Sequence, residues 1–370
     1  MANLNSKEIQ AWLSEAILDP PNTQPIYIVG QPGIGKSAVI RQAAVDCKVD
    51  FIDIRPAQRD PTDVRGIPAV IKAKCGYCKG SGSLKINDET LQCPVCAGVG
   101  TLDMAKWLPP PELPMNPDWR GFISLEELSS APPLTQAAYY QLVLDRRVGE
   151  YYLPKGAYVV ASGNRIEDRA VVYKMSTALA NRFTHIDFEV NIDNWIEWAL
   201  KSDIYSDVIA YIKFKPTLLA PAFVSDSSEK AFPTPRTWEF TSRILYKNLS
   251  REIKIKLIEG TIGRGATSEF AAFLRLKNDL PDIDEILNGK DYVPAKIDLK
   301  YALVSALASK AKTDKHFERL LTYSDKLGGE FSVLLIKLLA VRNKILLSTS
   351  TSWKSWAMAH NDLIIDRNRS

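Results

Sequence analysis

A glycine-rich stretch between an apolar run and a helical pattern constrains this chain most. Residues 30–37 read Gly-Gln-Pro-Gly-Ile-Gly-Lys-Ser, a G-x-x-x-x-G-K-S pattern. Its glycines let successive backbone N–H groups point inward, toward the spot that the N-terminus of the following helix also faces. Such a loop is expected to bind phosphates, so that Lys36 can reach the β- and γ-phosphates and the Ser37 hydroxyl can ligate Mg²⁺. A glycine turn without a ligand is the alternative. The expected nucleotide-binding residues are Gly30, Gln31, Pro32, Gly33, Ile34, Gly35, Lys36 and Ser37.

The sequence around this loop has the order of elements that phosphate binding requires. Ile26–Val29 predicts a buried strand, and residues 37–47 carry apolar side chains on one helical face. A helix is expected over residues 4–18, and Phe51–Ile54 predicts the next strand. This alternation of strands and helices predicts an α/β fold with a parallel sheet.

Composition narrows the class of protein only loosely. The 370 residues exceed what one hydrophobic core usually organises, so two or three domains are expected. Hydrophobic residues make up 46% and charged residues 24%, as in ordinary globular proteins. A net charge of +4 is too small to indicate a nucleic-acid partner. Because the sequence has no long apolar window and no basic-then-apolar start, we expect a cytoplasmic protein without membrane contact.

Two copies of C-x-x-C-x-G-x-G interrupt the α/β pattern within residues 72–103. Each copy puts two thiolates on one turn, and two turns together provide the tetrahedral S₄ shell that Zn²⁺ prefers. The segment has too few apolar side chains for a core, so metal is expected to supply its folding free energy. Two disulfides or a redox site are the alternatives. The expected zinc ligands are Cys75, Cys78, Cys93 and Cys96, whereas Cys47 is expected to be a small core residue.

Polar residues follow two further strands. Residues 121–125 predict a strand that ends in Glu126 and Glu127, where phosphate-loop proteins place carboxylates that hold metal and activate water. A solvated helix start is the alternative for this acidic pair. Asn164 follows another apolar run and could orient water near a γ-phosphate, or simply form a turn.

The remaining elements are expected as follows. Residues 134–144 predict one helix, and residues 147–160 a hairpin that turns at Pro154–Gly156. Arg182 closes a helix before the strand His185–Phe188; an arginine there is ordinarily a helix C-terminal charge. From residue 190 onward the pattern is helical. It predicts an all-α region, with a loop at Pro281–Pro294 and last helices over 299–311 and 317–347.

Taken in order, these residues resemble the AAA+ ATPases, specifically the MoxR-like branch, over roughly residues 5–290. The segment Gln58–Pro68 and the expected hairpin at 148–160 are similar to segments of that branch. The matching motifs are Walker A at Gly30–Ser37, Walker B at Phe122–Glu127, the sensor-1 asparagine at Asn164, the arginine finger at Arg182 and the sensor-2 arginine at Arg236.

The resemblance implies an α/β P-loop NTPase core with a parallel sheet, an all-α lid and C-terminal helices. The corresponding ranges are 1–189 for the core, 72–103 for the zinc insert, 190–290 for the lid and 291–370 for the C-terminal extension.

The family forms rings, usually of six subunits, with ATP at each subunit boundary. By this resemblance, Glu127 polarises the attacking water and Asn164 positions it. Arg182 reaches the neighbouring subunit's site, and Arg236 couples the lid to the γ-phosphate. ATP, Mg²⁺ and Zn²⁺ are the implied ligands, with Ser37 and Glu126 at the magnesium.

Two features depart from the family pattern. Glu126 stands where Walker B normally has aspartate, and its extra methylene could misplace the Mg²⁺ water shell and slow hydrolysis. The cysteine insert resembles half of a DnaJ-type zinc finger, so one zinc is expected. It lies between the second strand and Walker B, where AAA+ proteins place pore loops. We therefore expect it to contact a protein client or partner.

Three functions are consistent with these residues. The first is a chaperone-like, ATP-driven protein-remodelling machine, which in MoxR-like relatives often acts with a von Willebrand-type partner. The second is a nucleic-acid motor or loader. The insert disfavours it, because Tyr77 is its sole aromatic residue and only a few lysines lie near the cysteines. The third is a weakly hydrolysing, ATP-gated scaffold, which Glu126 motivates.

Overall fold

The computed structural model describes residues 2–86, 89–165, 167, 172–221 and 230–342, together with 353, 356 and 358. The chain divides into two compact units. The first comprises Met1–Gly30 and Lys36–Phe188, and the second comprises Gln31–Gly35 and Glu189–Ser370. Five residues of the phosphate loop thus group with the helical unit. Each unit is described by itself below.

The first unit contains a six-stranded sheet in which every pairing is parallel. Apolar side chains on both faces explain why the strands read as near-continuous hydrophobic runs. All four residues of the strand before the phosphate loop are buried. The strand order is β1 (Ala2–Leu4), β12 (Thr184–Phe188), β2 (Ile26–Val29), β11 (Gly156–Gly163), β8 (Arg120–Leu125) and β3 (Asp50–Ile54).

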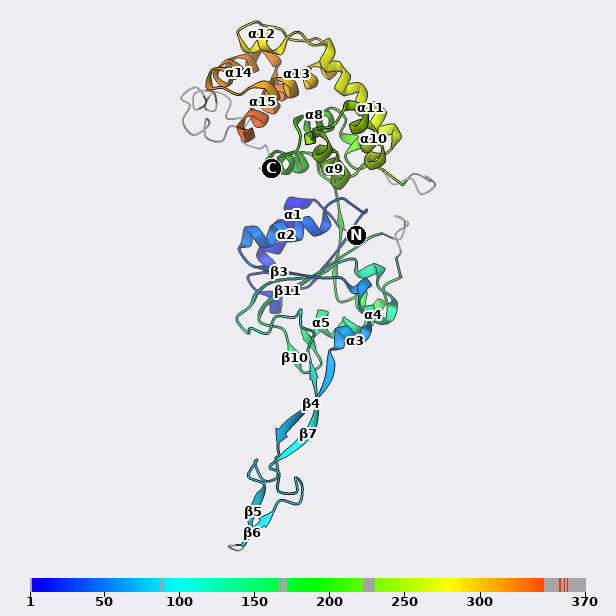
Figure 1. The fold of residues 1–370 in the computed structure, drawn as a ribbon, viewed down its shortest axis with the longest axis vertical. Helices are drawn as coiled ribbons and strands as arrows, with labels where there is room; N and C mark the ends of the chain where they lie inside the picture. The colour runs from blue at the N-terminus through cyan, green and yellow to red at the C-terminus, as the bar shows by residue number, and fades with distance from the viewer. Residues whose placement is uncertain are drawn as a thin grey trace. The chain divides into compact units, whose positions relative to one another are not determined.

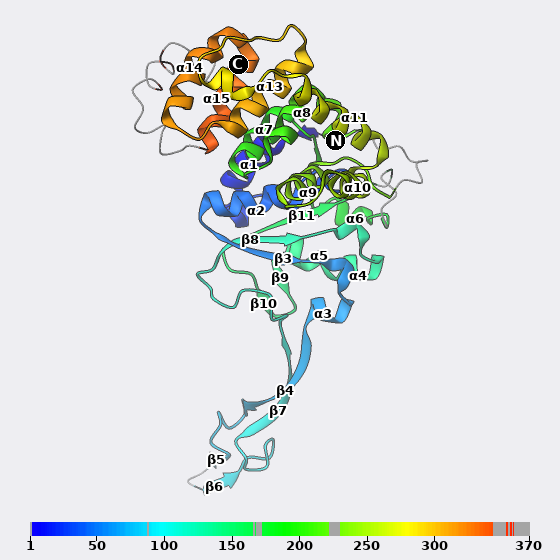
Figure 2. The same cartoon turned by 45° about the horizontal axis from the view of Figure 1, so that its top comes forward.

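Helices cover both faces of this sheet. One face carries α1 (Ser6–Ala16) and α2 (Lys36–Cys47), and α4 (Pro133–Ala138) and α5 (Tyr140–Leu144) lie on the other (Figures 1 and 2). The prediction of a single helix over residues 134–144 is wrong, because this segment forms two short helices, α4 and α5, which are separated at Tyr139. Alternate residues of each strand enter the two resulting core layers.

A long antiparallel ribbon joins α3 (Pro61–Arg65) to the cysteine segment. Strands β4 (Ile67–Lys74) and β7 (Thr101–Leu108) pair from Ile67 opposite Leu108 to Lys74 opposite Thr101. Beyond them, β5 (Ser83–Ile86) and β6 (Glu89–Gln92) form a second antiparallel pair. Figure 1 shows the ribbon in blue to cyan. The inserted structure is thus wider than the predicted range 72–103.

The predicted hairpin with a turn at Pro154–Gly156 is wrong. The hairpin consists of β9 (Arg147–Val148) and β10 (Tyr151–Tyr152), which are joined through Gly149 at φ +58°. Residues from Gly156 onward instead form β11, which pairs in parallel with β2 and β8. Sequence-distant partners, rather than the adjacent strand, determine where this segment lies.

Among the described residues of the second unit from Ile192 onward, the regular elements are all helices. The predicted loop at Pro281–Pro294 contains a short helix, because Asp282 accepts the N–H of Asp284 and caps it. Residues 343–347 of the last predicted helix lie outside the described residues. The helices are α7 (Ile192–Lys201), α8 (Ser206–Phe214), α9 (Pro235–Tyr246), α10 (Arg251–Ile262), α11 (Arg264–Arg275), α12 (Ile283–Leu287), α13 (Ile297–Lys310), α14 (Asp314–Leu327) and α15 (Gly329–Arg342).

One hydrophobic core runs through these helices. It joins Trp238 on α9 and Phe270 on α11 with Leu307, Leu320 and Leu335 farther along the chain. The regions predicted as 190–290 and 291–370 share this core. Within the described part of the chain, no helix combines the length and hydrophobicity needed to cross a membrane.

Candidate functional site

The phosphate loop follows β2 and opens α2, as the motif requires. Gly33 and Gly35 have φ of +79° and +104°, which residues with a side chain rarely adopt. Lys36 is only 9% exposed, and its Nζ donates to Gly30 O at 2.7 Å and to Asn164 Oδ1 at 3.0 Å. The structure therefore brings together two predicted site residues that lie 128 positions apart.

The Glu126 carboxylate is buried and accepts three serine hydroxyls. Ser124 donates to Oε1 at 2.6 Å, whereas Ser37 and Ser162 donate to Oε2 at 2.5 and 2.6 Å. Glu126 is 3% exposed, so these hydrogen bonds replace water around a charged group. The Ser37 contact places both predicted magnesium ligands side by side, and their oxygens are the donors that Mg²⁺ prefers.

Glu127 adopts a strained backbone conformation. Its φ of 56° and ψ of 36° lie in the left-handed region, which costs a residue with a side chain about 1–2 kcal/mol. The Glu127 N–H donates to Ser162 Oγ at 3.4 Å, and its side chain is exposed, unlike that of Glu126. Such strain commonly occurs at functional sites, where it aims a side chain.

Asn164 is fixed at its backbone by Ser129. Its N–H donates to Ser129 Oγ at 3.2 Å, and the Ser129 hydroxyl lies 3.4 Å from Asn164 O. Tyr27 lies beside Ser129; burial raises the pKa of Tyr27, and a hydrogen bond to Ser129 partly opposes that shift. The Asn164 side chain, held by Lys36 through Oδ1, thus faces the phosphate loop.

Arg182 is not joined to this group of residues by any contact among the described residues. Its Nη1 donates to Ala178 O at 2.5 Å, and its guanidinium lies 5.2 Å from the centre of the Tyr140 ring. Its Nε is buried and has no hydrogen-bond partner among the described residues.

Arg236 belongs to the first turn of α9 in the second unit. Its backbone N–H donates to Gly33 O at 3.1 Å, and its side chain is exposed. A Cβ added to Gly33 would lie 2.8 Å from Oγ1 of Thr234, the residue that caps α9. Within the second unit, the segment Gln31–Gly35 therefore packs directly against the start of α9.

The four cysteines predicted as zinc ligands form one buried cluster. Their sulfurs all lie within 4.8 Å of one another. The Cys75–Cys93 and Cys78–Cys96 sulfur pairs are 3.9 and 3.6 Å apart. A tetrahedral S₄ site with Zn–S near 2.3 Å has S···S edges of about 3.8 Å, so the cluster fits zinc.

The glycines of the repeated motif serve this cluster. Gly82 and Gly100 donate their N–H groups to the sulfurs of Cys78 and Cys96 at 3.3 and 3.2 Å. Burial raises the pKa of the Cys78 thiol, but the N–H groups of Gly82 and Gly80, together with the Cys96 and Cys75 sulfurs, lower its pKa to about 6. At Cys96, burial and the neighbouring thiols raise the pKa to about 11, against the lowering effect of the Gly100 N–H. These N–H donors therefore favour the thiolate that a metal requires.

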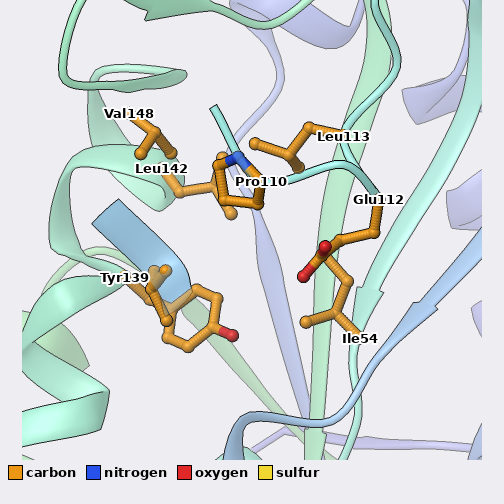
Figure 3. Close-up of a pocket in the computed structure, with 8 residues that line it drawn as sticks. Ile54, Pro110, Glu112, Leu113, Tyr139, Leu142 and Val148 are labelled. Atoms are coloured by element: carbon orange, nitrogen blue, oxygen red, sulfur yellow. The ribbon is translucent and has the colours of Figure 1, made fainter. Parts of the chain in front are cut away.

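A small hollow lies where the chain returns from the ribbon to the sheet. Figure 3 shows Pro110 and Leu113 beside Tyr139 and Leu142, which come from the α4–α5 segment. Its volume of about 10 Å³ suits one water molecule rather than a nucleotide. Glu112 at its rim forms an ion pair with Arg59 at 3.2 Å. This hollow is therefore a small gap in side-chain packing near the base of the ribbon.

Sequence reasoning missed Ser124, Ser129 and Ser162. Two of them carried a usable signal, since Ser124 lies two residues before Glu126 and Ser162 two before Asn164. Residues two apart on a strand share a face. The Ser129 contact depends on the turn after Glu127, which local pattern does not reveal.

The parallel sheet, the loop after β2, the acids after β8, the asparagine after β11 and the helical unit make up an α/β phosphate-loop fold, which is the fold that the resemblance to AAA+ ATPases implies. No protein-family model matches this chain, and no curated protein matches it.

Solved structures that resemble it include NtrX from Brucella abortus, at 12% identity and a TM-score of 0.35, covering 96% of this chain and 67% of that one. The Thermotoga maritima RuvB Holliday junction branch migration motor has 12% identity and a TM-score of 0.36, covering 82% and 80%. Both TM-scores lie below 0.5, so the fold assignment rests on the topology above.

Proposed function

We propose that this protein is a Mg²⁺-dependent AAA+ ATPase that converts ATP and water into ADP and phosphate. The observation that carries the proposal is the joining of Lys36 with Asn164, and of Ser37 with Glu126, at the carboxyl ends of adjacent parallel strands. This is where open α/β sheets bind ligands.

The residues have separate roles in this proposal. The loop N–H groups and Lys36 bind the phosphates, and Ser37 and Glu126 hold Mg²⁺, which neutralises phosphate charge when bound. Glu127 accepts a proton from the attacking water, and Asn164 orients that water. The left-handed backbone at Glu127 turns its side chain away from the buried cluster that holds Glu126. Two adjacent acids thus perform different tasks.

The proposal extends to assembly. We infer a ring, six subunits by family resemblance, in which Arg182 enters the neighbouring site and Arg236 couples the helical unit to the γ-phosphate. The absence of a partner for the buried Arg182 Nε within the described residues of one chain supports a role that a neighbour completes. The hydrogen bond from Arg236 N–H to Gly33 O supports coupling between loop and helix.

The insert gives this ATPase its proposed protein-remodelling role. We propose that the cysteine cluster binds one Zn²⁺ and that the ribbon contacts a protein client or a von Willebrand-type partner, as in a MoxR-like chaperone. Large apolar side chains on the ribbon support this role, since Ile67 is 71% and Val70 77% exposed. If deleting residues 73–102 leaves client or partner binding intact in a folded ring, the insert has another role.

The test is steady-state ATP hydrolysis over a range of protein concentrations, for the wild type and Glu127→Gln. We expect turnover that rises steeply with concentration, because Arg182 acts in trans, and a Glu127→Gln variant that binds ATP without hydrolysing it. Arg182→Ala should also bind ATP without turnover. If all three bind ATP and none hydrolyses it, the protein is a nucleotide-gated scaffold instead.

A further inference from the structure

We propose that Ser124 and Ser162 are positioning residues that fit this site to glutamate rather than aspartate at position 126. The inference rests on the proposed nucleotide and magnesium site. It reverses the expectation that the longer Glu126 side chain impairs that site.

The surroundings of Glu126 are matched to its length. Both carboxylate oxygens are occupied at 2.5–2.6 Å, Oε1 by Ser124 and Oε2 by Ser37 and Ser162. The three hydroxyls come from three elements, namely β8, α2 and β11. Since Ser124 and Ser162 are 0% and 1% exposed, water cannot replace either contact.

An aspartate does not satisfy the same three donors. Its carboxylate lies one C–C bond, about 1.5 Å, closer to the backbone. If the carboxylate moves by this distance, its oxygens cannot stay within hydrogen-bonding range of hydroxyls on three different elements. At least one buried hydroxyl therefore loses its acceptor. The aspartate would also lie farther from Ser37, the other predicted magnesium ligand.

Ser162 has a second contact that links the two acids. It accepts the Glu127 N–H at 3.4 Å while donating to Glu126 Oε2. One side chain thus holds the carboxylate next to Ser37 and supports the left-handed residue proposed to activate water. Among the described residues, the Ser124 hydroxyl hydrogen-bonds to Glu126 only, so the two serines make separable contributions.

The test measures metal-dependent nucleotide affinity rather than turnover. Binding of a fluorescent ADP analogue is titrated in Mg²⁺ and in EDTA, and Mn²⁺ binding to the ADP-loaded protein is followed by electron paramagnetic resonance. The gain in affinity on adding Mg²⁺ is the quantity compared. Variants are Ser124→Ala, Ser162→Ala and Glu126→Asp, with Ser14→Ala as control, because Ser14 donates to a backbone carbonyl on α1.

We expect Ser124→Ala and Ser162→Ala each to reduce the Mg²⁺-dependent gain about three- to tenfold, the usual effect of one hydrogen bond. Glu126→Asp should reduce it about tenfold. Affinity in EDTA should stay unchanged, because the loop backbone and Lys36 bind the phosphates without metal. Ser162→Ala alone should also lower turnover at saturating Mg²⁺, through Glu127.

The outcomes are distinguishable. If Glu126→Asp raises the gain, or both serine variants match Ser14→Ala, the inference is overturned and the proposed function stands. If the wild type binds no nucleotide at all, the proposed function fails and the inference fails with it. If the serine variants do not fold, Glu126→Asp still tests the inference. A smaller Mg²⁺-dependent gain in nucleotide affinity supports the inference, and a larger gain overturns it.

Discussion

Strands β8 and β4 belong to the same unit, yet their surroundings are opposite. Every residue of β8 after Arg120 is buried, whereas β4 has no buried residue. The sheet is stabilised by apolar burial, and its polar site forms where buried strands end. The ribbon leads instead to a segment with four buried cysteines, against which Leu84 and Leu102 pack. If the cysteine cluster binds zinc as proposed, the chain depends on two separate sources of folding free energy, apolar burial and metal binding, and changes to one should leave the other intact.

The largest expected effect is loss of the metal. Cys93→Ser removes one of four thiolates, and structural zinc sites contribute about 10–16 kcal/mol to folding. We expect loss of bound zinc and rapid amide hydrogen exchange over residues 67–108. Amides of β8 and β11 should stay protected.

Cys47→Ser is the matched control, since Cys47 lies outside the cluster on α2. It should retain zinc and a protected ribbon. Protection of the ribbon in a zinc-free Cys93→Ser protein would contradict the division into two energy sources.

The next prediction compares the loss of stability on truncating an apolar residue in the core of the sheet with the loss on truncating one on the ribbon. Leu113 is 3% exposed in the core of the sheet, and Val70 is 77% exposed on β4. Leu113→Ala should lower the free energy of unfolding by about 2–5 kcal/mol, because it leaves a cavity. Val70→Ala should change it by less than about 0.5 kcal/mol. Urea unfolding followed by tryptophan fluorescence measures both; equal losses would show that the ribbon carries a core of its own.

The smallest effect concerns the glycines of the cysteine repeats. Gly82 has φ +75°, and a Cβ there would lie 2.3 Å from Gly98 O, whereas a Cβ at Gly76 meets nothing within 4 Å. Strain at a left-handed residue costs about 1–2 kcal/mol before this overlap is counted. We therefore expect Gly82→Ala to weaken zinc affinity by roughly tenfold or more and Gly76→Ala to leave it unchanged. Competition with a chelating dye measures both, and equal affinities would refute the role of the glycine.

Local motifs were predictable from the sequence because their geometry is local. The loop at residues 30–37 and the two cysteine repeats need only a few consecutive residues to define their chemistry. The order of the strands was not predictable in this way. β3 follows β2 in sequence, yet β11 and β8 lie between them, and only long-range pairing determines that arrangement.

The difference between local motifs and long-range pairing also explains why the hairpin was predicted wrongly and why Ser162 was missed. Pro154–Gly156 has turn-forming residues, but the hairpin turns at Gly149, and β11 gains more by pairing with two buried strands. Ser162 is an ordinary strand serine until the neighbouring β8 brings Glu126 to it. The local sequence revealed which residues carry chemistry, but not which neighbours orient them.

The central claim is that Lys36, Asn164, Ser37 and Glu126 form a nucleotide site that is energetically independent of the cysteine cluster. The most direct measurement is equilibrium binding of a fluorescent ATP analogue to the wild type, Lys36→Ala and the exposed control Lys155→Ala, with zinc content measured on the same samples. Loss of a charged donor to phosphate should weaken binding about 10- to 100-fold in Lys36→Ala alone, with zinc retained in all three proteins. Equal affinity for ATP in Lys36→Ala and the wild type would contradict the account.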